Sequence, residues 1–221
     1  LMKQYGPHAM ADMMRKMGVG SYIDETYSLC VGSADISVYE MVAAYNTFPS
    51  KGVYVSPIFV TRIEDNMGNV IGEFNNTKRE AIGEHTAYLM ANLMQGVVNS
   101  GTGVRLRSKY GLKGEIAGKT GTTNDQSDGW FIGYTPSLTA GVWVGAEDRQ
   151  VHFESLALGG GSNMALPIWG LFMKKVLADG TLGVSEADRF VPSGIKLELN
   201  CDGSDADAVQ ASQDDESLYF D

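Results

Sequence analysis

The sequence predicts an α/β protein of the α+β type, in which an antiparallel sheet is flanked by helices. Three strand-like apolar runs follow one another closely, at residues 116–122, 130–134 and 138–145. Because the connections between them are short, neighbouring strands are expected to be antiparallel. The second and third runs are apolar on both faces of the strand. Both faces of the sheet should therefore be covered, most simply by helices.

Three helices are expected before these strands. The first spans residues 7–17, where Pro7 suits the first turn, Gly18 ends the helix and four methionines recur at helical spacing. We interpret the methionines as core packing and not as a cofactor site. The second helix opens at a capping box of Ser37 and Glu40, in which each side chain bonds a free backbone N–H of the other.

The most regular helical pattern lies at residues 84–99. It has two adjoining apolar rows, one of Leu89, Leu93 and Val97 and the other of Met90, Met94 and Val98. A last helix is expected at residues 166–177, with Pro167 in its first turn and Ser162 or Asn163 as its N-cap.

A β-hairpin is expected between the second and third of these helices. Residues 54–63 place Ile58, Val60 and Ile63 among polar residues, and residues 70–71 are apolar again. The residues between them, 65–68, have the composition of a turn. The two runs should therefore pair with each other.

The chain has 221 residues, of which 43% are hydrophobic, so it can bury the core of one domain, or at most two. Its formal charge is −10 and its pI is near 4.7. Because phosphate binding requires a basic surface and no cluster of Lys or Arg is visible, we expect no nucleic-acid partner. Residues 201–221 are acidic and contain no basic residue, so we expect them to form a disordered tail.

The remaining reactive side chains predict neither a metal site nor a cofactor. Cys30 and Cys201 are far apart in the sequence, and both a disulfide and two idle thiols remain open. His8, His85 and His152 stand alone, without the i,i+4 pairing or the nearby cysteines of a metal site. We interpret the three histidines as surface or helix-end residues.

The stretch AGKTGTTNDQSDGWFIGYTP, at residues 117–136, places a lysine between glycine and threonine. Gly118, Lys119 and Thr120 could end a Walker A phosphate loop, whose full form is G-x-x-x-x-G-K-[ST]. The first glycine of that motif would fall at residue 113, which is a lysine. The residues after Lys119 also indicate a turn, whereas a Walker A lysine opens a helix. We therefore do not expect nucleotide binding, and a P-loop protein remains a rival interpretation that Mg-ATP-dependent thermal stabilisation would support.

The same strand can serve another chemistry. Lys119 should point to one side of the strand and Thr120 and Thr122 to the other, because side chains alternate. Gly121 leaves the backbone bare between them. A cation, two hydroxyls and a free N–H would then lie close together. This set suits a substrate that has both a carboxylate to bind and a carbonyl under attack, with the N–H of Thr122 as one donor of an oxyanion hole.

Lys119, Thr120 and Gly121 match the K-T-G motif of serine β-lactamases and penicillin-binding proteins, whose other motifs are S-x-x-K and S-x-N. With its surroundings, the motif resembles the transpeptidase domain of class A penicillin-binding proteins, the bifunctional peptidoglycan synthases. The segments that carry the resemblance are residues 37–45, 101–103, 118–125, 128–136, 142–145 and 165–169, together with Gly52 and Pro57. It extends from residue 1 to about 180 and implies a β-lactamase-like fold.

The resemblance implies acyl transfer on peptidoglycan stem peptides. A serine attacks the D-Ala-D-Ala bond, D-alanine leaves, and the acyl group passes to an amine of a neighbouring strand, while β-lactams mimic the dipeptide and trap the serine. By the resemblance, Lys119 would support the site and the substrate carboxylate. Thr120 and Thr122 would bind that carboxylate, beside Gly121. The N–H of Thr122 would stabilise the oxyanion.

Several residues near the motif allow two interpretations. We interpret Trp130 and Trp143 as core packing. Asp128 could cap a turn or shape the site, and the sequence does not choose between these roles. The glycines at residues 159–161 could hold an anion at the start of a helix, but we expect a flexible loop.

The nucleophile of the family is missing from the sequence. The motifs should occur in the order S-x-x-K, S-x-N and K-T-G, and neither of the first two precedes Lys119. The one S-x-x-K joins Ser193 to Lys196, after the K-T-G motif, and Gly194 disfavours the helical turn that would bring the amine onto the hydroxyl. We expect residues 1–200 to form a transpeptidase domain that lacks its N-terminal part. This partial domain should be inactive alone.

The resemblance also sets expectations for the surface of this chain and for its parent protein. A partial domain should expose apolar surface, which favours oligomerisation, partial disorder or marginal stability. The sequence has no apolar run of about 18 residues. The family's membrane anchor and glycosyltransferase would lie upstream and would place the domain on the periplasmic, extracytoplasmic face of the bacterial inner membrane. The alternative interpretation is a non-catalytic cell-wall interaction module that retains the fold.

Overall fold

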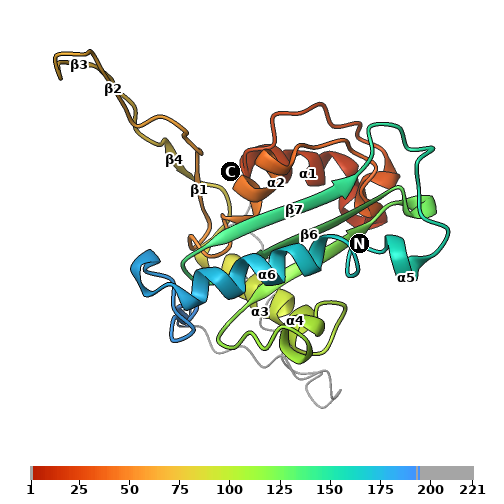
Figure 1. Ribbon diagram of the computed structural model, residues 1–221. Helices are drawn as coiled ribbons and strands as arrows, with labels where there is room; N and C mark the ends of the chain where they lie inside the picture. Colours follow the sequence, from red (N-terminus) through yellow and green to blue (C-terminus); the bar gives the residue numbers. More distant parts are fainter. Residues whose placement is uncertain (1, 193, 195–221) are drawn as a thin grey trace.

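The centre of the protein is a three-stranded antiparallel sheet in the order β5-β6-β7 (Figure 1). The computed structural model describes residues 2–192 and 194. β5 spans Ala117–Thr122, β6 spans Asp128–Tyr134 and β7 spans Thr139–Gly145. In the register of the sheet, Lys119 lies opposite Ile132, which lies opposite Gly141. The three predicted strands and their antiparallel order are confirmed.

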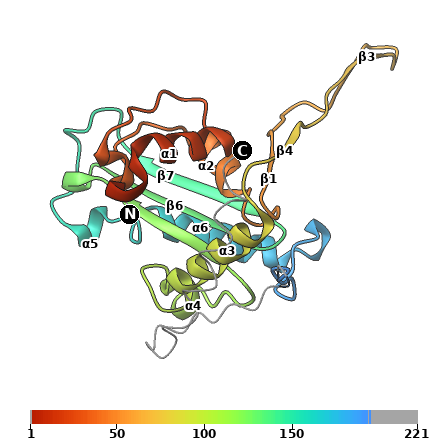
Figure 2. The same ribbon diagram turned by 180° about the vertical axis from the view of Figure 1, so that it is seen from behind.

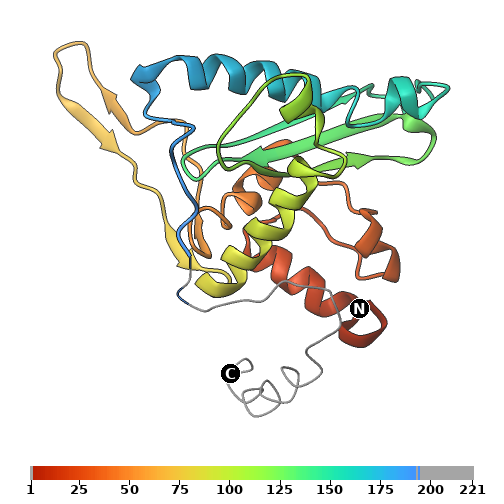
Figure 3. The same ribbon diagram turned by 90° about the horizontal axis from the view of Figure 1, so that it is seen from below.

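Helices cover both faces of the sheet, as predicted, with α6 on one face and α2 and α3 on the other (Figure 3). The bounds are Ala165–Ala178 for α6, Val38–Tyr45 for α2 and Glu84–Asn99 for α3. Beneath α6, the buried rings of Trp169 and Phe131 meet edge to face, with centroids 5.2 Å apart. The Trp169 indole N–H donates to the carbonyl of Ala140 over 3.0 Å, so this ring is buried with its donor satisfied. The predicted fold class is confirmed.

The two apolar rows of α3 differ in burial, although the helix has the predicted bounds. Met94 and Val98, from one row, are buried, whereas Leu93, from the other row, is 59% exposed. The helix runs along β5 on the face seen in Figure 2 and turns only one side toward the sheet. An apolar stripe wider than the contact with the sheet therefore leaves Leu93 at the surface.

The N-terminal helix α1 (Met2–Lys16) overlaps the helix predicted at residues 7–17, beginning earlier and ending one residue sooner. Gly6, at φ 78°, forms a kink immediately before Pro7, whose missing N–H costs no helical hydrogen bond there. Three of the four methionines pack around the buried Ala11, as predicted, namely Met10, Met14 and Met17. Met13 is 42% exposed, so the prediction is wrong for this one residue.

The predicted hairpin forms an arm that projects from the body of the protein (Figure 1). At its base β1 (Val53–Val55) pairs with β4 (Lys78–Glu80), and toward its tip β2 (Arg62–Glu64) pairs with β3 (Val70–Glu73). The predicted turn is closed by Asp65, whose carboxylate accepts from the N–H groups of Met67 and Asn69, both over 2.8 Å. The run predicted as one strand at residues 54–63 is divided in two, because Pro57 has no N–H to offer a ladder.

The predicted capping box opens α2 and also anchors the loop that follows α1. The Ser37 hydroxyl accepts from the N–H of Glu40 over 3.2 Å, and the Glu40 carboxylate accepts from the N–H of Ser37 over 3.1 Å. The same carboxylate accepts from the N–H of Gly20 and from the N–H and hydroxyl of Ser21. Burial works against this charge, but the hydrogen bonds from Ser37 and Ser21 outweigh it and lower the pKa of Glu40 to about 2.

Some expectations concern residues outside the described ones. They are the acidic tail at residues 201–221, Cys201, and Ser193 and Lys196 of the S-x-x-K sequence. Within residues 2–192 and 194, no helix has the length and apolar character needed to cross a membrane.

Replacing Glu40 should show how strongly this carboxylate stabilises the fold. We expect Glu40→Gln to lower the free energy of unfolding at neutral pH by about 1–3 kcal/mol, because several charge-assisted hydrogen bonds become neutral ones. A carboxyl whose pKa is lowered on folding contributes stability above its unfolded pKa, and this contribution is lost as the pH falls toward about 2. Urea unfolding at a series of pH values should show the difference from wild type shrinking over that range.

The matched control is Glu64→Gln on the exposed arm, where the carboxylate pairs with Arg62. An exposed pair contributes little, so this change should cost less than about 0.5 kcal/mol. Equal effects of the two substitutions would contradict an anchoring role for Glu40.

Candidate active site

β5 lies at the edge of the sheet, and the direction of its N–H groups follows from its pairing. The N–H of Thr123 donates to the carbonyl of Asp128 over 3.3 Å, and Thr122 is aligned with Gly129. In an antiparallel ladder, successive residues direct their N–H and C=O groups alternately toward and away from the partner strand. The N–H of Thr122 and the backbone groups of Thr120 therefore point to the free edge, away from β6.

Lys119 also reaches this edge. Its side chain is exposed and its Nζ donates to the carbonyl oxygen of Thr120 over 2.9 Å. In the register, Lys119 shares a face of the sheet with Ile132, whereas Thr120 shares the opposite face with Phe131. The strand alternates as the sequence predicts, and the flexible lysine brings its ammonium back to the edge beside the threonines.

The hydroxyls of Thr120 and Thr122 form hydrogen bonds with segments that are distant in the sequence. The hydroxyls of Thr120 and Thr102 lie 2.8 Å apart, and Thr102 belongs to the turn that follows α3. Thr122 Oγ1 accepts from the N–H of Gly161 over 3.0 Å. The structure therefore assembles β5 with two turns, at residues 101–103 and 159–163. Residues 101–103 already belonged to the family resemblance, whereas residues 159–161 were marked in the sequence only by their glycines.

The turn at residues 159–163 differs from the flexible loop predicted there. Gly159 ends the short helix α5 (Leu156–Gly159), and Gly159, Gly160 and Gly161 are all buried, because this segment packs directly on the sheet. A Cβ on Gly161 would lie 2.2 Å from the carbonyl oxygen of Gly121 and 2.6 Å from that of Trp130, so backbone meets backbone here. The prediction of a flexible loop is wrong for this reason.

The predicted cap of the last helix is also wrong. The N-cap of α6 is Met164, and no side chain bonds the first turn. The Asn163 side chain instead donates to the carbonyl of Leu156 over 2.9 Å and accepts from Arg105. Asn163 is therefore used in packing the turn and not in starting the helix.

The turn between β5 and β6 is held by Thr123. Its hydroxyl accepts from the N–H of Asp128 over 2.9 Å and lies 2.9 Å from the hydroxyl of Ser127. The carboxylate of Asp128 does not cap this turn: Oδ1 is buried and has no hydrogen-bond partner among the described residues. Thr123, and not Asp128, therefore caps this turn, which leaves site shaping as the role still open for Asp128.

The two tryptophans of the sheet are less buried than expected. Trp143 is 40% exposed, so its assignment to the core is wrong, and Trp130 beside it is partly buried. The register places both on the face that carries Lys119, in line with Gly121 at the end of the sheet. Gly121 contributes no side chain to cover the rings.

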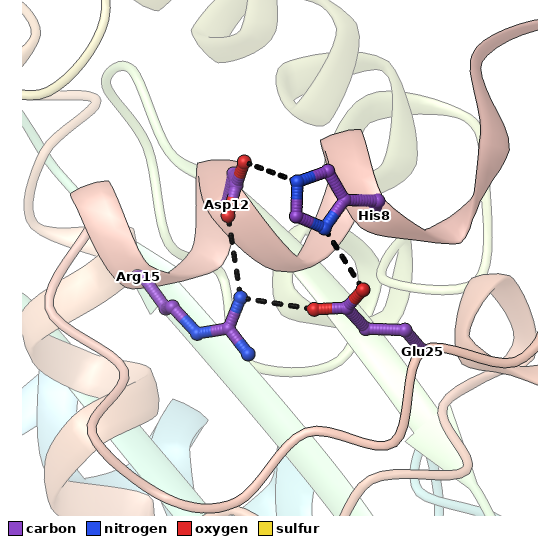
Figure 4. Close-up of polar contacts among 4 residues, drawn as sticks. All are labelled: His8, Asp12, Arg15 and Glu25. Atoms are coloured by element: carbon purple, nitrogen blue, oxygen red, sulfur yellow. Dashed lines mark hydrogen bonds and ion pairs between the residues drawn. The ribbon is translucent and has the colours of Figure 1, made fainter.

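No group of three or more His, Cys, Asp or Glu side chains able to hold a metal ion occurs in the part of the chain that the structure describes. His8, however, is not isolated: its Nδ1 lies 2.8 Å from Glu25 and its Nε2 lies 3.2 Å from Asp12 (Figure 4). Arg15 contacts both carboxylates over 3.2 Å. The cluster is exposed and ties the loop at residue 25 to α1. Cys30 is exposed and forms no disulfide with a described residue.

The neighbours of His8 should be visible in its titration. The hydrogen bond to Glu25, followed by the charge of Asp12, raises the pKa of His8 above 6.5. A raised histidine pKa stabilises the contact fully below the unfolded pKa, and this contribution is lost as the pH rises through the folded pKa. We expect an NMR titration of His8 to give a pKa above 6.5 that Glu25→Gln returns toward 6.5. Glu84→Gln on α3 should leave it unchanged, and an unshifted His8 in wild type would contradict the contact.

Comparison with known proteins shows the family to which the chain belongs. Residues 1–152 match the penicillin binding protein transpeptidase domain family. The chain is 31% identical over 176 residues to penicillin-binding protein 1A of Aquifex aeolicus, covering 80% of this chain and 23% of that protein. It is 37% identical over 155 residues to penicillin-binding protein 1A of Clostridium acetobutylicum, covering 70% of this chain and 18% of that protein. The chain belongs to the penicillin-binding protein transpeptidase domain family.

Solved structures show the same fold. Penicillin-binding protein 1A from Haemophilus influenzae matches with a TM-score of 0.72 and 21% identity, over 89% of this chain and 33% of that one. The penicillin-binding protein PonA1 from Mycobacterium tuberculosis matches with a TM-score of 0.69 and 26% identity, over 87% of this chain and 54% of that one. The resemblance inferred from the K-T-G motif and its surroundings is confirmed. The chain spans only a part of each of these proteins.

Proposed function

We propose that this chain supplies the substrate-binding strand of a serine D,D-transpeptidase that cross-links peptidoglycan stem peptides. The observation that carries the proposal is the free edge of β5, which offers the outward N–H of Thr122 beside the Lys119 ammonium and the hydroxyl of Thr120. Membership of the transpeptidase family and relatives named for penicillin binding support it.

In this proposal the β5 edge binds the end of a stem peptide. Lys119 and the hydroxyls of Thr120 and Thr122 bind the terminal carboxylate through charge-assisted hydrogen bonds. The N–H of Thr122 donates to the oxyanion that forms when the carbonyl of the first D-alanine is attacked. Gly121 leaves the strand without a side chain between these groups.

The attacking serine comes, in this proposal, from a part of the parent protein that precedes β5. Its oxygen bonds to the carbonyl carbon while the bond to the terminal D-alanine breaks, and an amine of a neighbouring stem peptide then displaces the serine oxygen. A β-lactam undergoes the first step only, since its ring C–N bond breaks and the serine stays acylated. A solved structure of PonA1 contains penicillin V. Because no S-x-x-K precedes Lys119, we propose that this chain is not acylated alone.

The parent protein is proposed to act at the extracytoplasmic face of the bacterial inner membrane, anchored there, and to carry a glycosyltransferase as well. The support is the similarity to penicillin-binding proteins 1A, which are several times longer than this chain. No cofactor is needed for the acyl transfer. A non-catalytic cell-wall interaction module is the second candidate, favoured by the lack of S-x-x-K ahead of the K-T-G motif.

Intact mass after incubation with penicillin V should separate the two candidates. We expect no adduct on this chain and one adduct, located on a serine, on a chain extended N-terminally through the parent gene. The reason is that the oxyanion donor and the nucleophile must meet in one site. No adduct on the extended chain would support the interaction module, and an adduct on Ser193 of this chain would contradict the proposal.

Exposed apolar surface is proposed to make this chain associate with itself. Leu93 on α3 is 59% exposed and lies on a face that carries other apolar side chains. Burying such a patch removes apolar area from water. Light scattering after gel filtration should show species larger than the monomer, and Leu93→Glu should reduce them, while Glu64→Gln on the arm should not. A wild-type monomer with a cooperative, high melting transition would contradict this expectation.

A further inference from the structure

The glycine-rich turn before α6 has an effect on the hydroxyl of Thr122 that the motif alone does not specify. A threonine hydroxyl has one hydrogen to donate and lone pairs to accept with. Thr122 Oγ1 accepts from the N–H of Gly161 over 3.0 Å, and no acceptor for its own hydrogen is found among the described residues. The Thr122 side chain is exposed. The turn therefore leaves Thr122 as a donor toward whatever binds at the β5 edge.

The turn at residues 159–163 is held in place by Arg105, which lies on the short helix α4 (Arg105–Ser108). Its Nη1 donates to the carbonyl oxygen of Ser162 over 3.3 Å and to the side-chain oxygen of Asn163. Asn163 passes the contact on by donating to the carbonyl of Leu156. Arg105 is partly buried and forms no ion pair with a carboxylate of the described residues, so this cation is committed to the backbone and side chain of the turn.

A single segment thereby reaches both Thr120 and Thr122. Thr102, three residues before Arg105, lies 2.8 Å from the hydroxyl of Thr120. Arg105 reaches Thr122 through the turn. We propose that residues 102–105 position the carboxylate-binding hydroxyls of β5, with Arg105 as a positioning residue that keeps Thr122 a hydrogen-bond donor. This inference rests on the proposed function and adds to it the residues that orient the binding groups.

The same helix provides a matched control. Arg107 donates to Asn99 Oδ1 over 3.0 Å and to the carbonyl of Leu112 over 3.0 Å. It is an arginine on α4 with neutral oxygen partners, like Arg105, but its contacts do not include the turn at residues 159–163. Arg107→Gln therefore removes a comparable set of structural hydrogen bonds without disturbing the support of Thr122.

The test compares penicillin V with its methyl ester as acylating agents of the N-terminally extended chain. Carboxylate recognition appears as the ratio of the two acylation rate constants. We expect Arg105→Gln and Thr122→Val each to lower this ratio by about 10-fold, the effect of one charge-assisted hydrogen bond. In Arg105→Gln, the rate with the ester should fall by less than the rate with penicillin V. The double variant Arg105→Gln with Asn163→Ala should lower the ratio no further than Arg105→Gln, because both residues hold the same turn.

A ratio unchanged in Arg105→Gln, or lowered equally in Arg107→Gln, would overturn the inference, since Arg105 would then have a purely structural role. Hydrogen exchange at the Gly161 amide decides the positioning independently of activity. It should become faster in Arg105→Gln and in Thr122→Val and stay slow in Arg107→Gln. An unchanged rate in Arg105→Gln would overturn the inference. A wild-type extended chain that is not acylated would contradict the proposed function, and the exchange measurement would still decide whether Arg105 holds the turn.

Discussion

The candidate site depends on one contact between backbone segments, in which the turn before α6 lies directly on β5 and β6. Three glycines meet there: a Cβ on Gly161 would lie 2.2 Å from the oxygen of Gly121, and a Cβ on Gly129 would lie 2.9 Å from the Cα of Gly161. Because side chains are excluded, the backbone itself sets the separation between the turn and the sheet. This separation brings the Gly161 N–H within hydrogen-bond distance of Thr122.

Around this contact, one face of the sheet is packed against a helix and the β5 edge of the sheet has no neighbouring strand among the described residues. The face under α6 is filled by buried aromatic and aliphatic side chains such as Phe131 and Trp169, which make the strands rigid. The free edge of β5 stays open, so the N–H groups that no neighbouring strand uses remain available to a ligand. A rigid strand with an unused edge is a suitable platform for recognising a peptide, because backbone donors are already in place before binding.

The parts further from the sheet are joined by charged hydrogen bonds as well as by apolar packing around Ala11. Glu40 gathers the loop after α1 onto the start of α2, and the cluster around His8 holds the next part of that loop to α1. The arm of β1 to β4 is exposed along most of its length. A two-stranded ribbon with little core beneath it is of marginal stability by itself, so the arm is the least supported part of the described structure.

Local patterns in the sequence were sufficient for most of the elements. The capping box of Ser37 and Glu40, the bounds of α3 and the antiparallel order of β5, β6 and β7 need only nearby residues, and each was predicted correctly. Patterns could not assign burial in the same way. Leu93 belongs to a predicted apolar row and Trp143 was expected in the core, but both lie at the surface. An apolar pattern in the sequence does not show how wide the neighbouring element is, so it does not show which apolar side chains that element will cover.

The sequence by itself determined that a K-T-G strand exists, which family it resembles, and that its side chains alternate. Only the tertiary structure showed which residues position the side chains of that strand. Thr102 and Arg105 come from one segment outside β5 and Gly161 from another, and nothing in their local sequence says which hydroxyl or carbonyl they will meet. Such contacts depend on the packing of distant elements, which turn chemistry and periodicity do not encode.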